Sequence, residues 1–283
     1  MRSISSERPL DPAAVAILRA VHGITDGCGI RYLVVGATAR DILLTHVHGL
    51  PATRATKNVD FAVAVETWAE FGEIGAALVQ HAGFRAATDA PHRFYYVHAN
   101  ARSYPLDLVP FGGVAGADLK LRWPPDMTVL MNVAGYAEAA ASAERVKIAD
   151  DLIVNVASLP GLALFKLLAW HDRAPGNTKD ADDLLTLMRN YSEAGNIDRV
   201  FELDEDVFAA LGYDPDAAGV LLLGADIAKL AKRATLAQCQ AILNDPILIV
   251  RLAMHMARTR PNVEEGKALA DRLLGILVKS LRE

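Results

Sequence analysis

The sequence has few of the features that mark a specialised class of protein. It holds two cysteines among 283 residues, Cys28 and Cys239, with no CxxC pair and no Cys/His spacing typical of zinc. We therefore expect a reduced, cytoplasmic protein and not a disulfide scaffold. Residues 1–9 contain two arginines but no apolar segment follows them, so we expect no signal peptide.

Long apolar runs and an excess of positive charge are also lacking. The longest apolar runs, such as residues 220–223 and 246–250, fall far short of the ~20 residues that span a bilayer, so we expect no membrane partner. Acidic residues outnumber basic ones by 34 to 29, and the net charge is −5. This balance argues against broad electrostatic binding to nucleic acid and leaves a local basic patch open.

Hydrophobic residues are plentiful at 52%, enough for a large core and one or two domains. Up to about residue 157, short apolar runs alternate with amphipathic segments, which indicates an α/β domain. The expected strands are residues 32–35, 59–65, 94–97, 106–109 and 153–156, and the expected helices begin near residues 12, 38 and 67. Residues 46–57 are polar and contain Gly49 and Pro51, so we predict a loop there.

From Ser158 onward, apolar residues recur at spacings of three and four, which predicts helices to the end of the chain. These helices are expected over residues 158–172, 180–190, 217–233, 236–243, 246–258 and 263–281. We therefore predict two domains, an α/β domain over residues 1–157 and an all-helical domain over residues 158–283.

Gly36 and Ala37 follow the first buried strand, and a helical pattern resumes at Thr38. Small residues at such a turn let a phosphate approach the backbone, and the following helix offers amide groups to an anion. An ordinary strand–turn–helix junction gives the same pattern.

Asn58 and Asp60 lie two apart at the start of the next strand, so they share one face of it. Two oxygen-bearing side chains there can reach one magnesium ion, which prefers hard oxygen ligands. Asp107 offers another acid in the apolar run 106–109. The alternatives are a solvated pair at the strand edge for the first two, and an ion pair with Arg93 or Arg102 for Asp107.

Lys166 lies on the most apolar helical segment, where its ammonium group can reach toward a phosphate or extend to solvent. Asp180 and Asp183 follow, and they can equally cap and solvate the next helix.

Together these residues resemble a known family. The residues that carry the resemblance are, in order, Gly36-Ala37, Asn58-Val59-Asp60, Asp107, Lys166, Arg173, Asp180 and Asp183. The first three groups resemble the nucleotidyltransferase signature of the DNA polymerase β superfamily. The later ones resemble the second half of AbiEii-type nucleotidyltransferase-like proteins, a group that includes toxins of toxin–antitoxin and phage-defence systems.

The resemblance covers most of residues 30–185 and implies a mixed-sheet domain flanked by helices, a helical domain, and an NTP with Mg²⁺ or Mn²⁺ between them. Carried over by position, Gly36, Ala37, Thr38, Arg40 and Lys166 would bind the NTP, Asn58, Asp60 and Asp107 the metal, and Asp60, Asp107, Lys166 and Asp180 would serve catalysis. The implied reaction moves a nucleoside monophosphate to a hydroxyl of RNA (tRNA included), protein or a small molecule. An antitoxin partner is also implied.

Two departures from the signature leave alternatives open. Ala37 replaces the usual Gly or Ser, and Asn58 replaces the first acid, which removes a charge that would help to hold the metal. Asp41 and Glu66 are candidate substitutes, although Glu66 is expected beyond the far end of the strand. The alternative to an active enzyme is a catalytically weakened nucleotide-binding or interaction protein of the same fold. A third interpretation is a different α/β enzyme in which these acids are structural.

Overall fold

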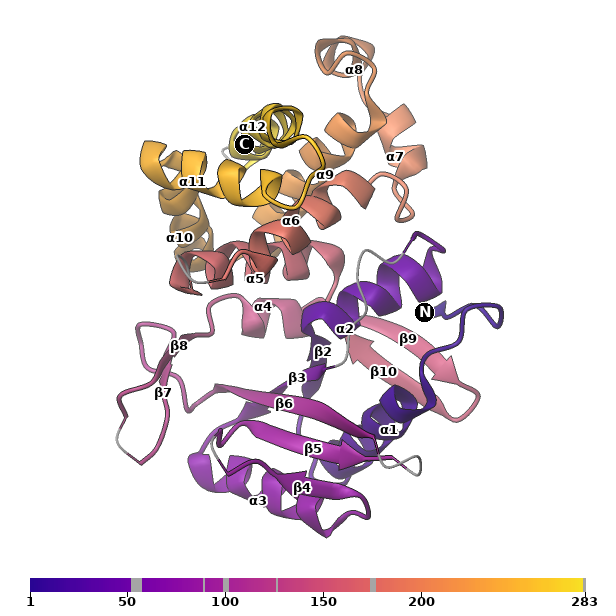
Figure 1. Ribbon diagram of the computed structural model, residues 1–283, viewed down its shortest axis with the longest axis vertical. Helices are drawn as coiled ribbons and strands as arrows, with labels where there is room; N and C mark the ends of the chain where they lie inside the picture. Colours follow the sequence, from indigo (N-terminus) through magenta and orange to yellow (C-terminus); the bar gives the residue numbers. More distant parts are fainter. Residues whose placement is uncertain (52–57, 89, 99–101, 126, 174–176, 282–283) are drawn as a thin grey trace. The chain divides into compact units, whose positions relative to one another are not determined.

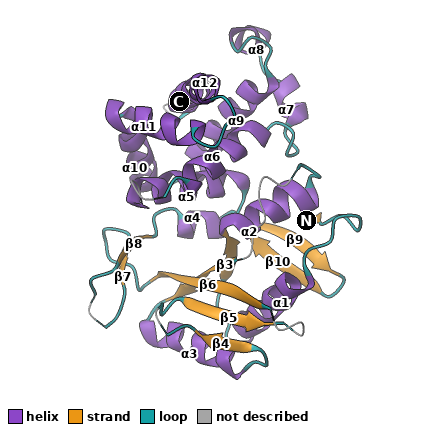
Figure 2. Ribbon diagram, in the orientation of Figure 1, coloured by secondary structure: helices purple, strands orange, loops and turns teal. Residues whose placement is uncertain are grey.

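The computed structural model describes residues 1–51, 58–88, 90–98, 102–125, 127–173 and 177–281 (Figure 1). The chain forms two compact units, Met1–Ser158 and Leu159–Glu283. Strands are confined to the first unit, and the described part of the second is helical (Figure 2).

The elements of the first unit alternate between strands and helices. In chain order they are β1 (Arg2–Ser3), α1 (Pro12–Gly27), β2 (Tyr32–Val35), α2 (Gly36–Asp41), the π-helix η1 (Ile42–Val47), β3 (Val59–Val65), α3 (Trp68–Gln80), β4 (Phe84–Ala86), β5 (Arg93–Val97), β6 (Ser103–Gly112), β7 (Lys120–Arg122), β8 (Leu130–Asn132), α4 (Tyr136–Ala141), β9 (Glu144–Ala149) and β10 (Leu152–Val156). Local signals explain the main helix starts, because Asp11 caps α1 and Thr67 caps α3 with their side chains.

Eight of these strands form one sheet, in the order β1-β9-β10-β2-β3-β6-β5-β4, and β7 pairs with β8 separately. The large sheet is mixed, since β1 with β9, β10 with β2, and β3 with β6 are parallel pairs and the other neighbours run antiparallel. The mixed sheet flanked by helices is therefore confirmed.

The two faces of this sheet differ near β5 and β6. Helix α3 covers one face, where a Cβ added to its Gly75 would lie 3.1 Å from the Phe94 ring. Phe94, Leu106 and Leu108 are buried on that side. Because successive residues of a strand point to opposite faces, Arg93 and Asp107 project from the other face.

The second unit buries the apolar stripes of its helices against one another, as the spacing predicts. Its elements are α5 (Leu159–Arg173), α6 (Lys179–Asn190), α7 (Ile197–Phe201), α8 (Glu205–Ala210), α9 (Pro215–Leu230), α10 (Arg233–Asn244), α11 (Pro246–Ala257) and α12 (Val263–Ser280). The predicted all-helical C-terminal part is confirmed. No described helix has the length and hydropathy needed to cross a membrane.

Several elements differ from the sequence prediction. The predicted loop over residues 46–57 is wrong at its start, because η1 continues through Val47, while residues 52–57 lie outside the described residues. The predicted helix over residues 217–233 ends earlier, at Leu230, and Arg233 already belongs to α10. The elements with no sequence prediction are β1, β4, β7, β8, β9, α4, α7 and α8.

Candidate functional site

The predicted phosphate turn lies directly beside the predicted acid. Strands β2 and β3 pair with Val35 opposite Asp60, so the next residue, Gly36, reaches the Asp60 side chain. A Cβ on Gly36 would overlap the Asp60 carboxylate, and Gly36 has a φ of +67°. Only glycine satisfies both conditions without strain. The turn therefore needs Gly36 for its backbone conformation and for its contact with Asp60.

Other predicted residues near this turn are engaged within the fold. The Thr38 hydroxyl donates to the Asn58 carbonyl at 2.7 Å, which ties α2 to the start of β3. Arg40 is 2% exposed, and its Nε and Nη2 donate to one oxygen of Asp41 at 2.9 and 2.7 Å. In this arrangement Arg40 is an internal ion-pair partner of Asp41 and does not face solvent.

Asp60, Asp107 and Arg93 form a cross-strand row on the face of the sheet opposite α3. Asp60 of β3 pairs with Asp107 of β6, and Asp107 pairs with Arg93 of β5. Side chains of directly opposite residues share a face, so the three lie next to one another. Glu66 follows the last residue of β3 while Asp60 is its second residue, which places Glu66 at the far end of the strand as expected.

Arg93 neutralises the negative charge of Asp107. Arg93 donates through Nε to one Asp107 oxygen and through Nη2 to the other, each at 2.7 Å. These hydrogen bonds raise the pKa of Arg93 above its ordinary value. The side chain of Asp107 is 14% exposed and that of Arg93 is 34% exposed. The alternative in which Asp107 pairs with an arginine is the arrangement that the structure contains.

The residues predicted to hold metal do not fit a resident two-metal centre. Both Asp107 oxygens bond to Arg93, and Asn58 brings no charge. Among the described residues, no group of three or more His, Cys, Asp or Glu side chains could hold a metal ion. Asp60, the remaining acid of this set, takes part in an interaction of its own.

Lys166 and Asp180 lie in the second unit and meet there. The Lys166 ammonium is 3.0 Å from an Asp180 oxygen and 2.6 Å from an Asp183 oxygen, and Arg173 reaches Asp180 at 3.1 Å. The side chains of Asp180 and Asp183 are 4% and 1% exposed. A buried pair of carboxylates needs such a cation, so Lys166 has a structural role in this cluster.

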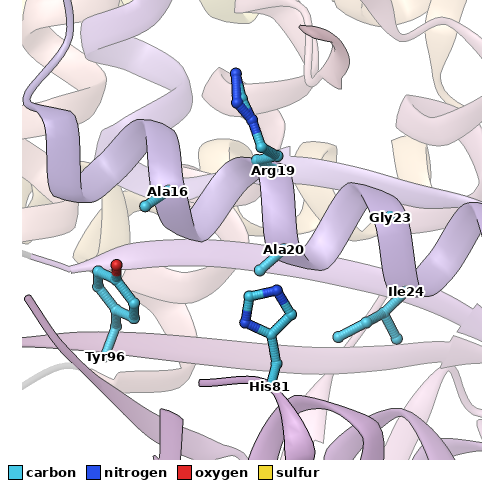
Figure 3. Close-up of a pocket in the computed structure, with 7 residues that line it drawn as sticks. All are labelled: Ala16, Arg19, Ala20, Gly23, Ile24, His81 and Tyr96. Carbon is cyan, nitrogen blue, oxygen red and sulfur yellow. The ribbon is translucent and has the colours of Figure 1, made fainter. Parts of the chain in front are cut away.

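A separate groove of about 290 Å³ lies between α1 and the end of α3. Figure 3 shows His81 and Tyr96 beside the small residues Ala16 and Ala20 of α1, while Arg19 extends away and pairs with Asp151 at 2.8 Å. None of the predicted site residues lines this groove.

Two residues of these clusters were missing from the predicted site. Arg93 was only one of two candidate partners for Asp107, and its place depends on the register of β5 against β6. Asp183 follows Asp180 by three residues, a spacing that puts both on one face of a helix, so the spacing itself carried that signal.

The order of these features along the chain agrees with a match to a known protein family. The model described as nucleotidyl transferase AbiEii toxin, type IV TA system, matches residues 26–268. The chain belongs to this family. The AbiEii match includes Gly36, Asp60 and Asp107 of the first unit as well as Lys166 and Asp180 of the second, and it identifies the chain as a nucleotidyltransferase. No curated protein matches the chain significantly.

Solved structures are similar to this AbiEii-family chain at a low level. A crystal structure of ANT(2″)-Ia in complex with adenylyl-2″-tobramycin is 15% identical, with a TM-score of 0.37, over 61% of this chain and 86% of that one. A nucleotidyltransferase-like protein from Paracoccidioides brasiliensis is 14% identical, with a TM-score of 0.41, over 73% and 93%. The Thermotoga maritima CCA-adding enzyme complexed with tRNA is 12% identical, with a TM-score of 0.28, over 98% and 83%. Likeness at this level does not extend to substrates.

Proposed function

We propose that this AbiEii-family chain transfers a nucleoside monophosphate from an NTP to a hydroxyl group of an acceptor. The observation that carries the proposal is the contact between the Gly36 turn and Asp60, within a chain whose family match covers residues 26–268. In the reaction an acceptor oxygen bonds to the α-phosphorus, the bond to the β-phosphate oxygen breaks, and pyrophosphate leaves with its electron pair. The acceptor proton passes to a base or to water.

The cation for this reaction is proposed to arrive with the nucleotide. Magnesium keeps waters and substrate phosphates as ligands and needs only one or two protein carboxylates. Asp60 suits that requirement, with the side-chain amide oxygen of Asn58 as a neutral second donor. We therefore expect the substrate to be an NTP complex of Mg²⁺ or Mn²⁺, and we expect chelation of divalent cations to stop transfer.

The acceptor class and pathway are proposals drawn from the family. The description of the AbiEii family as a type IV toxin supports a toxin with an antitoxin partner. We expect it to act in the cytoplasm, on a hydroxyl group of RNA, protein or a small molecule. Expression of the wild-type chain in a bacterium is expected to arrest growth, and expression of Asp60→Asn at equal level is expected not to. Equal growth arrest by both variants would contradict a toxin that acts by nucleotidyl transfer.

Asn58 favours a second candidate function, a nucleotide-binding protein with little or no turnover. Its neutral side chain stands where the signature has an acid, so it binds a divalent cation more weakly than a carboxylate would. Pyrophosphate release by the wild type and by Asn58→Asp separates the two functions. Release by the wild type supports the enzyme, whereas NTP binding without release, and release only by Asn58→Asp, supports the binding protein.

A further inference from the structure

The Asp60–Asp107–Arg93 row has an unusual charge for a site that handles a polyphosphate and its cation. Arg93 cancels the charge of Asp107, and Asn58 is neutral where the signature has an acid. Three acids at positions 58, 60 and 107 would carry a charge of −3 and would need several divalent charges before a triphosphate could approach. The row instead brings a fixed positive charge beside Asp107.

Arg93 is placed and exposed in a way that suits phosphate binding. It lies one strand from Asp107 and two strands from Asp60, on the face of the sheet opposite α3. Its side chain is 34% exposed, although Asp107 fixes it through two hydrogen bonds. A guanidinium has five N–H donors in a rigid plane. The pair with Asp107 uses two of them, and the side chain of Tyr95, two residues along the same strand, also interacts with Arg93.

The Asp107 carboxylate has the properties of an anchor for this arginine. It is 14% exposed, both of its oxygens accept from Arg93, and it stands between Arg93 and Asp60 in the row. A guanidinium held in this way meets a phosphate with little loss of conformational freedom, since its orientation is already fixed.

We propose that Arg93 is a phosphate-binding residue of the nucleotide site and that Asp107 positions it. This proposal rests on the proposed function. In this proposal the guanidinium of Arg93 takes the place of a second divalent cation that the protein would otherwise hold. It also changes the role of Asp107 from metal ligand to positioning residue.

The first test is binding of each of the four ribonucleoside triphosphates to the full chain by calorimetry, with Mg²⁺ and with EDTA. For the NTP that binds most tightly, Arg93→Gln is expected to weaken binding roughly 10- to 100-fold under both conditions, as loss of a charge-assisted contact does. Arg93→Lys should retain part of the affinity. The matched control is Arg145→Gln, which removes the same charge from an exposed residue of β9 and should change binding less than about twofold.

Unchanged NTP binding by Arg93→Gln would overturn the inference while leaving the proposed function intact. Failure of the wild type to bind any of the four NTPs would overturn the proposed function, and this inference with it.

The second test keeps Arg93 and so does not depend on the folding of Arg93→Gln. Binding of Mn²⁺ in the presence of NTP is measured by electron paramagnetic resonance for Asp107→Asn and Asp60→Asn. We expect one Mn²⁺ per nucleotide in the wild type, nearly unchanged Mn²⁺ affinity in Asp107→Asn, and a large loss in Asp60→Asn. Equal losses in both variants, or two Mn²⁺ per nucleotide in the wild type, would make Asp107 a metal ligand and overturn the inference.

Discussion

At the scale of single residues, the site depends on how closely Gly36 and Asp60 approach. The register that places Val35 opposite Asp60 brings the turn to the carboxylate, and only a residue without a Cβ fits there. The same carboxylate stands at one end of the row that ends in Arg93. The conformation of the turn at Gly36 therefore determines that the Asp60 carboxylate lies directly against it.

Substitution Gly36→Ala is expected to cost roughly 1–3 kcal/mol of unfolding free energy and to abolish tight NTP binding. The added methyl group meets the Asp60 carboxylate at a φ of +67°. Gly29→Ala is a matched control, since Gly29 has a φ of +66° and nothing within 4 Å of an added Cβ. Urea denaturation and calorimetry with NTP measure both effects. If Gly29→Ala weakens NTP binding as much as Gly36→Ala does, the contact with Asp60 is not what matters.

At the scale of elements, helices α5 and α6 are joined by a buried charge cluster. Lys166 of α5 lies between Asp180 and Asp183 of α6, and both acids are almost fully buried. Buried carboxylates are costly unless a cation lies beside them, and here the Lys166 ammonium fills that role. Because the ammonium comes from α5 and the carboxylates from α6, the cluster constrains how the two helices pack.

Replacement of Lys166 by methionine is expected to destabilise the chain by roughly 3–5 kcal/mol, because it removes the ammonium group that lies between two buried carboxylates. The exposed Lys179 begins α6, and Lys179→Ala should stay within about 0.5 kcal/mol of the wild type. Chemical denaturation compares the two. A Lys166→Met protein as stable as Lys179→Ala would show that the cluster does not support the helices.

Elements also show which parts of the fold the sequence could predict. Strand β2 is fully buried, five of the seven residues of β3 are buried, and the long C-terminal helices have strong periodicity, so these elements were predictable. Strand β4 has three residues and helix α7 has five, too few to show a period. Strand β9 does alternate, with Val146 and Ile148 buried, and that signal was available in the sequence.

Some residues of the candidate site could also be predicted from the sequence, and others could not. The small-residue turn and the spacing of Asn58 and Asp60 are local patterns that the sequence displays directly. The choice of Arg93 over Arg102 as the partner of Asp107 depends on the register of β5 with β6. A slip of one residue would turn the arginine to the other face, and no local pattern determines it.

At the scale of the whole molecule, both units contain histidines whose pKa is lowered by folding. Burial lowers the pKa of His48 and His92 in the first unit and of His255 in the second, and neighbouring arginines lower each further. For His92, Asp107 acts in the opposite direction without reversing the shift.

Stability is therefore expected to fall as the pH drops below about 6.5, the ordinary histidine pKa. Below that pH the histidines of the unfolded chain bind protons that those of the folded chain do not, so acid favours unfolding. Well above that pH neither state binds these protons, and the histidines no longer affect stability. Thermal melting between pH 7.5 and 5.5 measures the decline, and His92→Gln should make it shallower. A melting temperature that rises over this interval would show that other groups control the acid response.

The central claim is that Asp60 serves nucleotidyl transfer in this AbiEii-family chain. Its most direct test is transfer of label from each α-phosphate-labelled NTP, with Mg²⁺ or Mn²⁺, to bulk tRNA, to protein and to water. The wild type is compared with Asp60→Asn and with Asp151→Asn, an exposed acid of the same unit. We predict transfer by the wild type and by Asp151→Asn, and a loss of roughly 10²- to 10³-fold in Asp60→Asn. Equal transfer by the wild type and Asp60→Asn would contradict the claim.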